Sequence, residues 1–298
     1  MFQSHFGEIS ALGSAFCWTI TAVAFETAGK KVGSISVNLI RLVIGFILIS
    51  IFNLFTRGMI LPIDASSSTW FLLTISGIIG FVIGDLFLFQ AYVEVGSRIS
   101  MLIMSTVPPI TAITGFIIMN ERITGLGIFG MIVTIIGIAI VILTKNPDDR
   151  KVMLSHPIKG LIYAFIGALG QAFGLVFSKL GMGSYNPFAA TQIRIIAAII
   201  GFLIFITVTK KWSKVFFAIK DSKAMRHISI GSVFGPFVGV SLSLLAVQYA
   251  PTGIVSTITS ITPILIIPLS IFVFKEKILP KEILGAIITL VGISLLFI

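Results

Sequence analysis

Asp85 stands out chemically because it is a carboxylate set deep inside an apolar stretch of the chain. It lies about fifteen residues into that stretch, and an ionised group at such a depth in a bilayer is costly unless it is paired or hydrated. Helical spacing places Phe81, Phe89 and Tyr92 on the same stripe as the carboxylate. Asp85 therefore either carries a proton or binds a cation, or it is a structural acid that pairs with Arg41 or with hydrogen-bond donors of the core.

Arg41 and Arg194 occupy equivalent places, each about five residues inside the start of an apolar stretch. If the two halves of the chain are inverted, Arg41 lies near the cytoplasmic surface and Arg194 near the opposite one. Each guanidinium can then bind an anionic group at its own entrance, or extend along its flexible stem to the lipid headgroups. Glu26 lies close enough in depth to Arg41 for us to expect a structural pair between them.

Two prolines, Pro108 and Pro263, lie inside apolar stretches and predict helix kinks. Proline removes a backbone hydrogen bond, which is tolerated at membrane depth only against protein or a water-filled cavity. Ser105 and Ser260 lie beside the prolines, where a hydroxyl can satisfy the freed backbone groups or face a ligand. We therefore expect both bends to border a central cavity.

The sequence contains no constellation typical of an enzyme. The three histidines fall in terminal or loop segments, and none has a second ligand at metal-binding spacing. Cys17 has no histidine partner near its depth, and no glycine-rich phosphate loop follows a strand. We predict no catalytic residues, no metal and no cofactor.

The composition is that of an integral membrane protein, with 56% hydrophobic residues, 11% charged residues and a mean hydropathy of +1.11. A bilayer core needs about 20 mostly apolar residues per helix. Such stretches predict ten transmembrane helices at about 9–28, 36–55, 70–92, 99–119, 124–143, 158–178, 188–208, 228–249, 254–274 and 283–298. The predicted fold class is an all-α membrane protein.

The second half of the chain repeats the first. A shift of 153 positions carries Trp18 to Gln171 near the midplane and Arg41 to Arg194, and further along the chain the shift is 155. The organisation predicted is a first five-helix repeat over 1–145, a cytoplasmic linker over 146–157 and a second five-helix repeat over 158–298.

The positively charged residues gather in alternate loops, on one side of the expected membrane helices. This distribution excludes nucleic-acid binding as the explanation for the positive charge. Most of the 21 Lys and Arg residues fall in the odd-numbered loops between the expected helices, and the positive-inside rule places those loops in the cytoplasm. Both termini should then lie outside the cytoplasm. Because five is an odd number, the repeats must enter the plasma (inner) membrane from opposite sides, as inverted repeats do.

One unit occurs twice: a proline, a glutamate thirteen residues later, and glycines nine and sixteen residues beyond the glutamate. Its two copies are Pro108, Glu121, Gly130, Gly137 and Pro263, Glu276, Gly285, Gly292. In this the chain resembles the drug/metabolite transporter superfamily, in its ten-helix EamA-type branch. The resemblance implies a central basket whose path is lined by the proline regions together with Trp18, Asp85, Gln171 and Gln248, with the fifth and tenth helices at the periphery.

Two features depart from the resemblance. Several ten-helix relatives keep their termini in the cytoplasm, whereas the charges here indicate the reverse. Four-helix multidrug relatives rely on a glutamate in the middle of the first helix, where this chain has Cys17 and Trp18.

The expected function is secondary active transport of a small organic metabolite such as an amino acid, by alternating access and in the direction of export. The sequence contains no nucleotide-binding motif, so the chain does not use ATP itself. The expected driving force is therefore a gradient of protons or of another ion. A lipid-carrier flippase and a membrane-embedded enzyme are the alternatives. The expected partners are the substrate, the coupling ion and membrane lipids, and the chain is a monomer or a homodimer.

Overall fold

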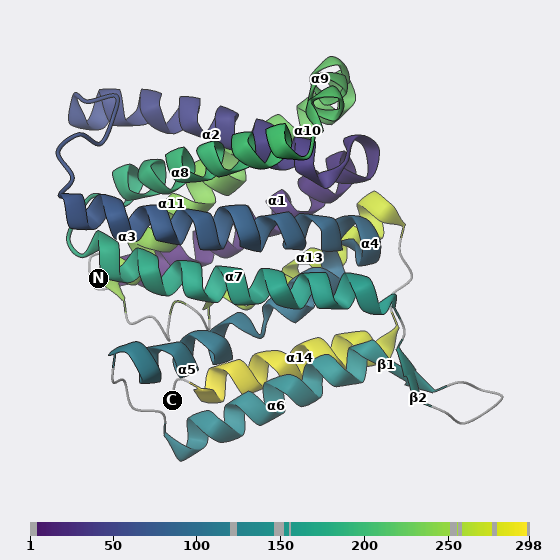
Figure 1. Cartoon of the computed structure of the whole chain (residues 1–298). Helices are drawn as coiled ribbons and strands as arrows, with labels where there is room; N and C mark the ends of the chain where they lie inside the picture. The colour runs from purple at the N-terminus through teal and green to yellow at the C-terminus, as the bar shows by residue number, and fades with distance from the viewer. Residues whose placement is uncertain are drawn as a thin grey trace.

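The computed structural model describes residues 5–119, 124–145, 152–154, 156–250, 255, 258–275 and 279–296. These residues form a bundle of helices with one short hairpin (Figure 1). The helices of the first half are α1 (Phe6–Val32), α2 (Ser34–Arg57), α3 (Ser67–Gly77), η2 (Ile78–Gly84), α4 (Asp85–Met104), α5 (Val107–Met119) and α6 (Gly125–Ile142). Those of the second half are α7 (Ile158–Met182), α8 (Pro187–Val208), α9 (Trp212–Lys220), α10 (Ser222–Ser232), η3 (Val233–Gly239), α11 (Val240–Tyr249), α13 (Thr262–Phe274) and α14 (Pro280–Leu296).

Within the described ranges, 7 helical stretches are long and apolar enough to cross a membrane, and the helices over Val107–Ile118 and Thr262–Phe274 are apolar but shorter. This differs in detail from the ten transmembrane helices predicted. One reason is that α3, η2 and α4 run together over Ser67–Met104. Gly96, with φ 81°, turns the chain inside that run, so α4 contains both the end of the third expected helix and the start of the fourth.

The prolines lie at helix starts rather than at kinks. The chain makes a turn at Ser105 and Thr106, and α5 begins at Val107, directly before Pro108. In the second half α13 begins at Thr262, directly before Pro263. A proline in the first turn of a helix loses no intrahelical hydrogen bond, which is why the chain breaks into two helices here instead of bending one.

The segments η2 and η3 are π-helical and occupy equivalent places in the two halves, 155 positions apart. The wider π turn is rare and is found mostly as a single turn inside an α-helix, often at functional sites. Here η2 ends directly before Asp85, so the π turn sets the direction in which that carboxylate points.

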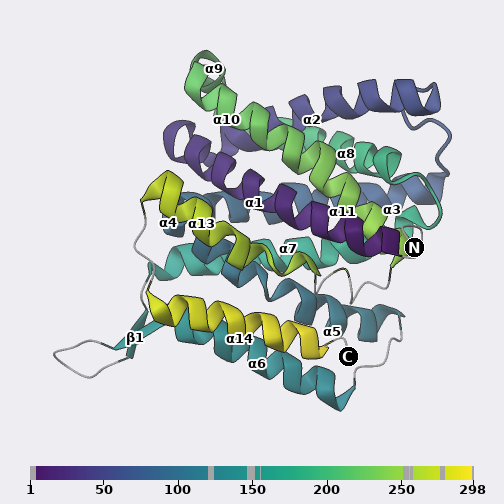
Figure 2. The same cartoon turned by 180° about the vertical axis from the view of Figure 1, so that it is seen from behind.

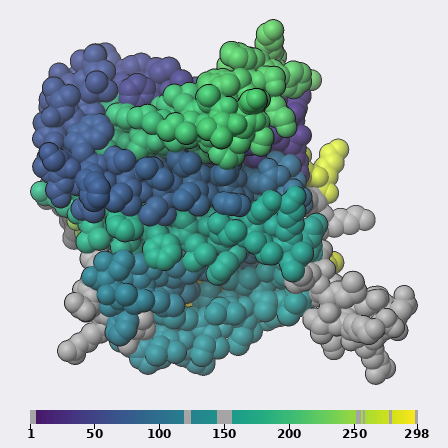
Figure 3. Space-filling view, in the orientation of Figure 1, coloured from purple at the N-terminus to yellow at the C-terminus, as the bar shows by residue number. Residues whose placement is uncertain are grey.

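Each main helix packs on a helix of the other half. Helix α1 packs on α10, η3 and α11, whereas α7 packs on α3, η2 and α4. Helix α2 packs on α8 in the same way. Figure 3 shows the band of α3 and α4 lying directly against α7 on the face in view. The two halves are therefore interleaved rather than set side by side.

Helices α6 and α14 form a separate pair at one edge of the bundle, as Figures 1 and 2 both show. Glycines let their backbones approach, since a side chain on Gly137 would collide with the backbone of Thr289, and one on Gly292 with that of Thr134. The outer face is apolar; on α6 alone, Phe129 and Ile135 are 55% and 59% exposed. Such a continuous apolar surface suits contact with lipid, and the protein is an integral membrane protein.

The two halves are joined by an antiparallel hairpin, in which β1 (Leu143–Lys145) pairs with β2 (Val152–Leu154). The expected plain linker over 146–157 therefore contains a strand, while residues 146–151 and 155 lie outside the described residues. In Figure 1 this hairpin and α9 lie at one end of the bundle, and the N and C labels lie at the other.

Candidate functional site

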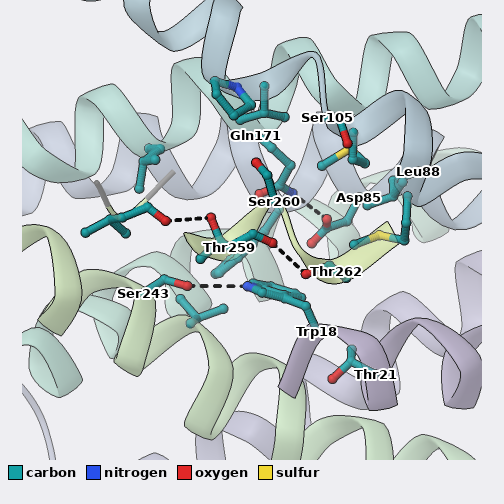
Figure 4. A pocket seen from close by; sticks show the side chains of 18 of the residues that line it. Trp18, Thr21, Asp85, Leu88, Ser105, Gln171, Ser243, Thr259, Ser260 and Thr262 are labelled. Atoms are coloured by element: carbon teal, nitrogen blue, oxygen red, sulfur yellow. Dashed lines mark hydrogen bonds between the residues drawn. The ribbon is translucent and has the colours of Figure 1, made fainter. Parts of the chain in front are cut away.

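A cavity of about 160 Å³ lies between the two halves of the chain. Side chains from α1, η2, α4 and the start of α5 line it from the first half, and side chains from α7, α8, α11 and α13 line it from the second. Figure 4 shows Trp18, Asp85, Gln171 and Ser260 grouped around it. Of the residues expected to form the path, it is lined by Trp18, Asp85, Phe89, Tyr92, Ser105, Pro108, Gln171, Arg194, Ser260 and Pro263.

Asp85 is held by two partners. One carboxylate oxygen forms an ion pair with Arg41, and the other accepts a hydrogen bond of 2.6 Å from Nε2 of Gln171 (Figure 4). The same amide nitrogen donates to the carbonyl of Gly80 at 3.2 Å, inside the π-helical segment. Gln171 therefore ties the carboxylate of the first half to a helix of the second.

Arg41 lies behind the cavity wall, buried inside the bundle. It is 1% exposed, and its Nε donates to Asn38 at 3.2 Å, while the amide of Asn38 donates to the carbonyl of Asp85 at 3.1 Å. The ring of Phe89 lies 4.5 Å from its guanidinium carbon. We expected Arg41 to bind an anion at an entrance or to extend to the lipid headgroups; the structure corrects this, because the carboxylate and the aromatic rings hold the side chain inside the bundle.

Arg194 is also buried inside the bundle, which corrects the alternative that it extends to the lipid headgroups. It is 4% exposed, it lines the cavity, and its guanidinium carbon lies 4.4 Å from the centre of the Phe81 ring. A side chain on Gly80 would come within 3.1 Å of an Arg194 nitrogen, so the glycine leaves the space that the guanidinium fills. The two equivalent arginines thus share one aromatic ring instead of guarding two entrances.

The remaining polar wall is made of hydroxyl groups and one indole. Trp18 Nε1 donates to Ser243 at 3.4 Å, and Ser243 Oγ lies 2.6 Å from Ser14 Oγ. At the two helix starts, the hydroxyls of Thr106 and Thr262 donate to backbone carbonyls three residues earlier, at 2.8 and 2.7 Å. Hydroxyl groups therefore satisfy part of the backbone that the breaks expose.

Two expected residues lie elsewhere. Gln248 does not line the cavity; it donates to the backbone carbonyl of Tyr185 at 3.2 Å, because it sits at the far end of α11. Glu26 does not pair with Arg41; it forms an ion pair with Lys30 and accepts from the amide of Ser97 at 2.6 Å. Glu26 thus caps the backbone that follows the Gly96 turn.

Sequence reasoning missed the hydroxyl-bearing residues Thr21 and Ser243 and several apolar residues of the wall, among them Leu88, Met101, Met104 and Val247. Ser243 had a signal: it continues the four-residue spacing of Gly231, Gly235 and Gly239 along the expected eighth helix. Nothing in the sequence distinguishes the apolar residues of the cavity wall from apolar residues that face lipid.

The comparisons with known proteins decide the family. The sequence model of the EamA-like transporter family matches residues 5–143 and 158–298. The chain belongs to this family. It is therefore a transporter-family protein built from two EamA-like repeats, and the cavity lies between residues of both.

Among the similar proteins are a curated relative and a protein of known structure. The EamA-like chain is 26% identical over 181 residues to an uncharacterized transporter of Clostridium kluyveri, a match that covers 59% of this chain and 56% of the relative. The aligned part thus spans little more than half of that relative's length. A protein of known crystal structure superposes with a TM-score of 0.62 over 97% of this chain and 96% of its own, at 13% identity, which shows a shared fold.

Proposed function

We propose that this EamA-like chain is a secondary active transporter that exports a small organic metabolite across the plasma membrane by alternating access. The observation that carries the proposal is the cavity between the two repeats, lined by polar groups from both. Transporters built from repeats bind their substrate near the midplane at the repeat interface, beside interrupted helices. The breaks before Pro108 and Pro263 supply such interruptions here.

We also propose that ten membrane helices form two inverted repeats, with both termini outside and the basic loops in the cytoplasm. Equivalent π-helical segments and equivalent pairings of α1 and α7 support a twofold relation between the repeats. The start of α1 and the end of α14 lie opposite α9 in the bundle, which supports a common side for the termini (Figure 1). Helix α9 contains lysines, and the positive-inside rule therefore places the end of the bundle at which α9 lies in the cytoplasm.

The size of the cavity favours a small metabolite over the lipid carrier that a flippase would move. A space of about 160 Å³ resembles the engineered cavity of about 150 Å³ that binds benzene, which is the size of a small metabolite.

Transport is tested with proteoliposomes that are loaded with unlabelled solute and then exposed to the same solute carrying a radiolabel. Amino acids and small carboxylates are tried in turn. We expect exchange that protein-free liposomes lack. Ser105→Trp should abolish it, because Ser105 is 3% exposed and lines the cavity, which the indole would fill.

Ile135→Trp is the matched control, because Ile135 lies on the outer face of α6 and is 59% exposed. Exchange that survives Ser105→Trp as well as it survives Ile135→Trp would show that the solute does not pass through this cavity.

A further inference from the structure

The charged groups at the cavity do not balance. Asp85 and Arg41 form a complete ion pair, and Gln171 supplies a further donor to the carboxylate. Arg194 adds a second positive charge to the same region, within reach of the same Phe81 ring. Among the described residues that line the cavity, Asp85 is the single acidic one. The positive charge of Arg194 therefore remains uncompensated.

The guanidinium of Arg194 has no hydrogen-bond acceptor and no ion pair among the described residues. Its Nε is buried without a partner, although the side chain as a whole is 4% exposed. A buried charge that lacks a partner is strongly destabilising, and a guanidinium at membrane depth normally faces a partner or a water-filled cavity. Phe81 covers one face of Arg194, and the cavity lies beside it.

We infer that the cavity binds the carboxylate of a small organic anion, with Arg194 as the counter-charge. This inference rests on the proposed transport function and narrows its substrate class. A guanidinium presents a planar fork of donors that matches a carboxylate, and a single excess charge matches a single carboxylate. Asp85 is already held by Arg41 and Gln171, so the ligand needs no ammonium group.

The rest of the cavity selects an apolar body for the ligand. Trp18, Leu88 and Val247 are among the side chains of the wall, and the volume suits a body of about the size of benzene. Benzoate, benzamide and benzylamine share this body and carry a negative, a neutral and a positive group at neutral pH. They are therefore matched probes for the charge of the site.

The test is the melting temperature of the purified full-length chain in detergent, with each probe titrated separately. A ligand that binds the folded state raises the melting temperature in a concentration-dependent way. We expect benzoate to raise it and benzamide and benzylamine to leave it unchanged. Sodium chloride and sodium phosphate at the same concentrations distinguish an organic carboxylate from an inorganic anion.

Three variants assign the effect to Arg194. Arg194→Gln should weaken benzoate at least about tenfold, because the charge-assisted bonds are lost. Arg194→Lys keeps the charge without the planar fork and should bind with intermediate strength. Arg226→Gln removes an exposed arginine from α10 and should leave the benzoate titration unchanged. Arg194→Gln removes an unpaired charge, so we expect it to fold and to melt no lower than the parent.

The inference is overturned by equal stabilisation from benzamide or phosphate, by an unchanged benzoate titration in Arg194→Gln, or by the lack of any shift with benzoate. Transport of another solute without benzoate binding would overturn the anion site and leave the proposed transport function standing. Benzoate binding without any exchange in liposomes would overturn the proposed transport function and leave the anion site standing.

Discussion

Among single residues, Asp85 illustrates how depth in the membrane constrains a side chain without defining its role. Its sequence position allowed either a proton carrier or a structural acid. The structure contains the Arg41–Asp85 ion pair and adds Gln171 as a partner from the second repeat. A carboxylate with both oxygens engaged is well placed to fix the wall of the cavity.

We predict that Asp85→Asn lowers the free energy of unfolding by roughly 3–5 kcal/mol, because it leaves Arg41 buried without its counter-charge. Adding Arg41→Gln should restore part of that loss, as expected for residues in contact. Denaturant unfolding of the two single variants and the double variant measures the coupling. Strictly additive losses would show that the pair contributes nothing.

The same variant tests whether Asp85 also couples transport to protons. If it does, Asp85→Asn should abolish accumulation driven by a pH gradient, while exchange of solute down its own gradient stays measurable, because asparagine cannot release a proton. Unchanged transport, pH dependence and stability would contradict both roles.

Residue types predicted from the sequence much of what lines the cavity, but not how far each side chain lies from a surface. Arg41 and Arg194 are equivalent in the repeat, and their distance from the helix start indicated two surfaces. The ring of Phe81 lies beside both guanidinium groups inside the bundle instead, and the carboxylate of Asp85 pairs with Arg41 there. Such contacts depend on which helix faces which, and spacing along one helix does not contain that information.

The helices of the site depend on close backbone approach. Helix α7 crosses η2 where Gly170 faces Gly84, and a Cβ added to Gly170 would lie 2.5 Å from the Gly84 Cα atom. We predict that Gly170→Ala destabilises the protein by about 1–3 kcal/mol, because the backbone must shift to admit the methyl group. Thermal unfolding in detergent measures it.

Gly125→Ala at the start of α6 is the control, since nothing lies within 4 Å of a Cβ there. Alanine also favours the helix more than glycine does. Equal melting temperatures for the two alanine variants would show that the close crossing of α7 and η2 is not needed for stability.

A second prediction at this scale concerns acid. Asp221 caps α10 and accepts a hydrogen bond of 2.7 Å from Lys31 at the end of α1. The Lys31 hydrogen bond lowers the pKa of Asp221 below its ordinary value. The stabilisation is therefore present above the ordinary aspartate pKa and lost as the pH falls through the lowered value.

Melting temperatures measured between about pH 3 and pH 7 should fall less on acidification in Asp221→Asn than in the parent, because asparagine keeps the cap without the charge. If the melting temperatures of Asp221→Asn and the parent fall equally on acidification, the contact between Asp221 and Lys31 does not contribute to stability.

Element boundaries were predicted where apolar runs end at charges or glycines, as in α2 and α8. The π turns and the breaks before the prolines were not. A π turn has the same composition as the surrounding helix, and a proline inside an apolar run fits a kink as well as a helix start. Packing between the repeats decides both.

For the whole molecule, we predict that α9 and the start of α3 lie on opposite sides of the membrane. Cysteines are introduced singly as Lys220→Cys and Ser68→Cys, both at exposed positions, in a Cys17→Ala background. An impermeant thiol reagent applied to intact cells should label Ser68→Cys but not Lys220→Cys, because the lysine-rich end belongs in the cytoplasm. The reverse labelling would invert the proposed orientation.

The duplicated architecture could be predicted from the sequence, since the two repeats share a proline, a glutamate and two glycines at the same spacing. Their interleaving could not, because a repeat shows that two units are alike and says nothing of which surfaces meet. The pairings of α2 with α8 and of α6 with α14 come from the structure alone.

That interleaving has a consequence for how the protein is made. Helix α1 leaves the ribosome well before three of the segments on which it packs, α10, η3 and α11, which begin only at Ser222. At a synthesis rate of about 5–20 residues per second, α1 waits roughly 10–40 s in the membrane before they arrive. During that time the buried hydroxyl of Ser14 lacks its partners Gly239 and Ser243, so biogenesis should depend on an insertion factor or chaperone that holds the early helices.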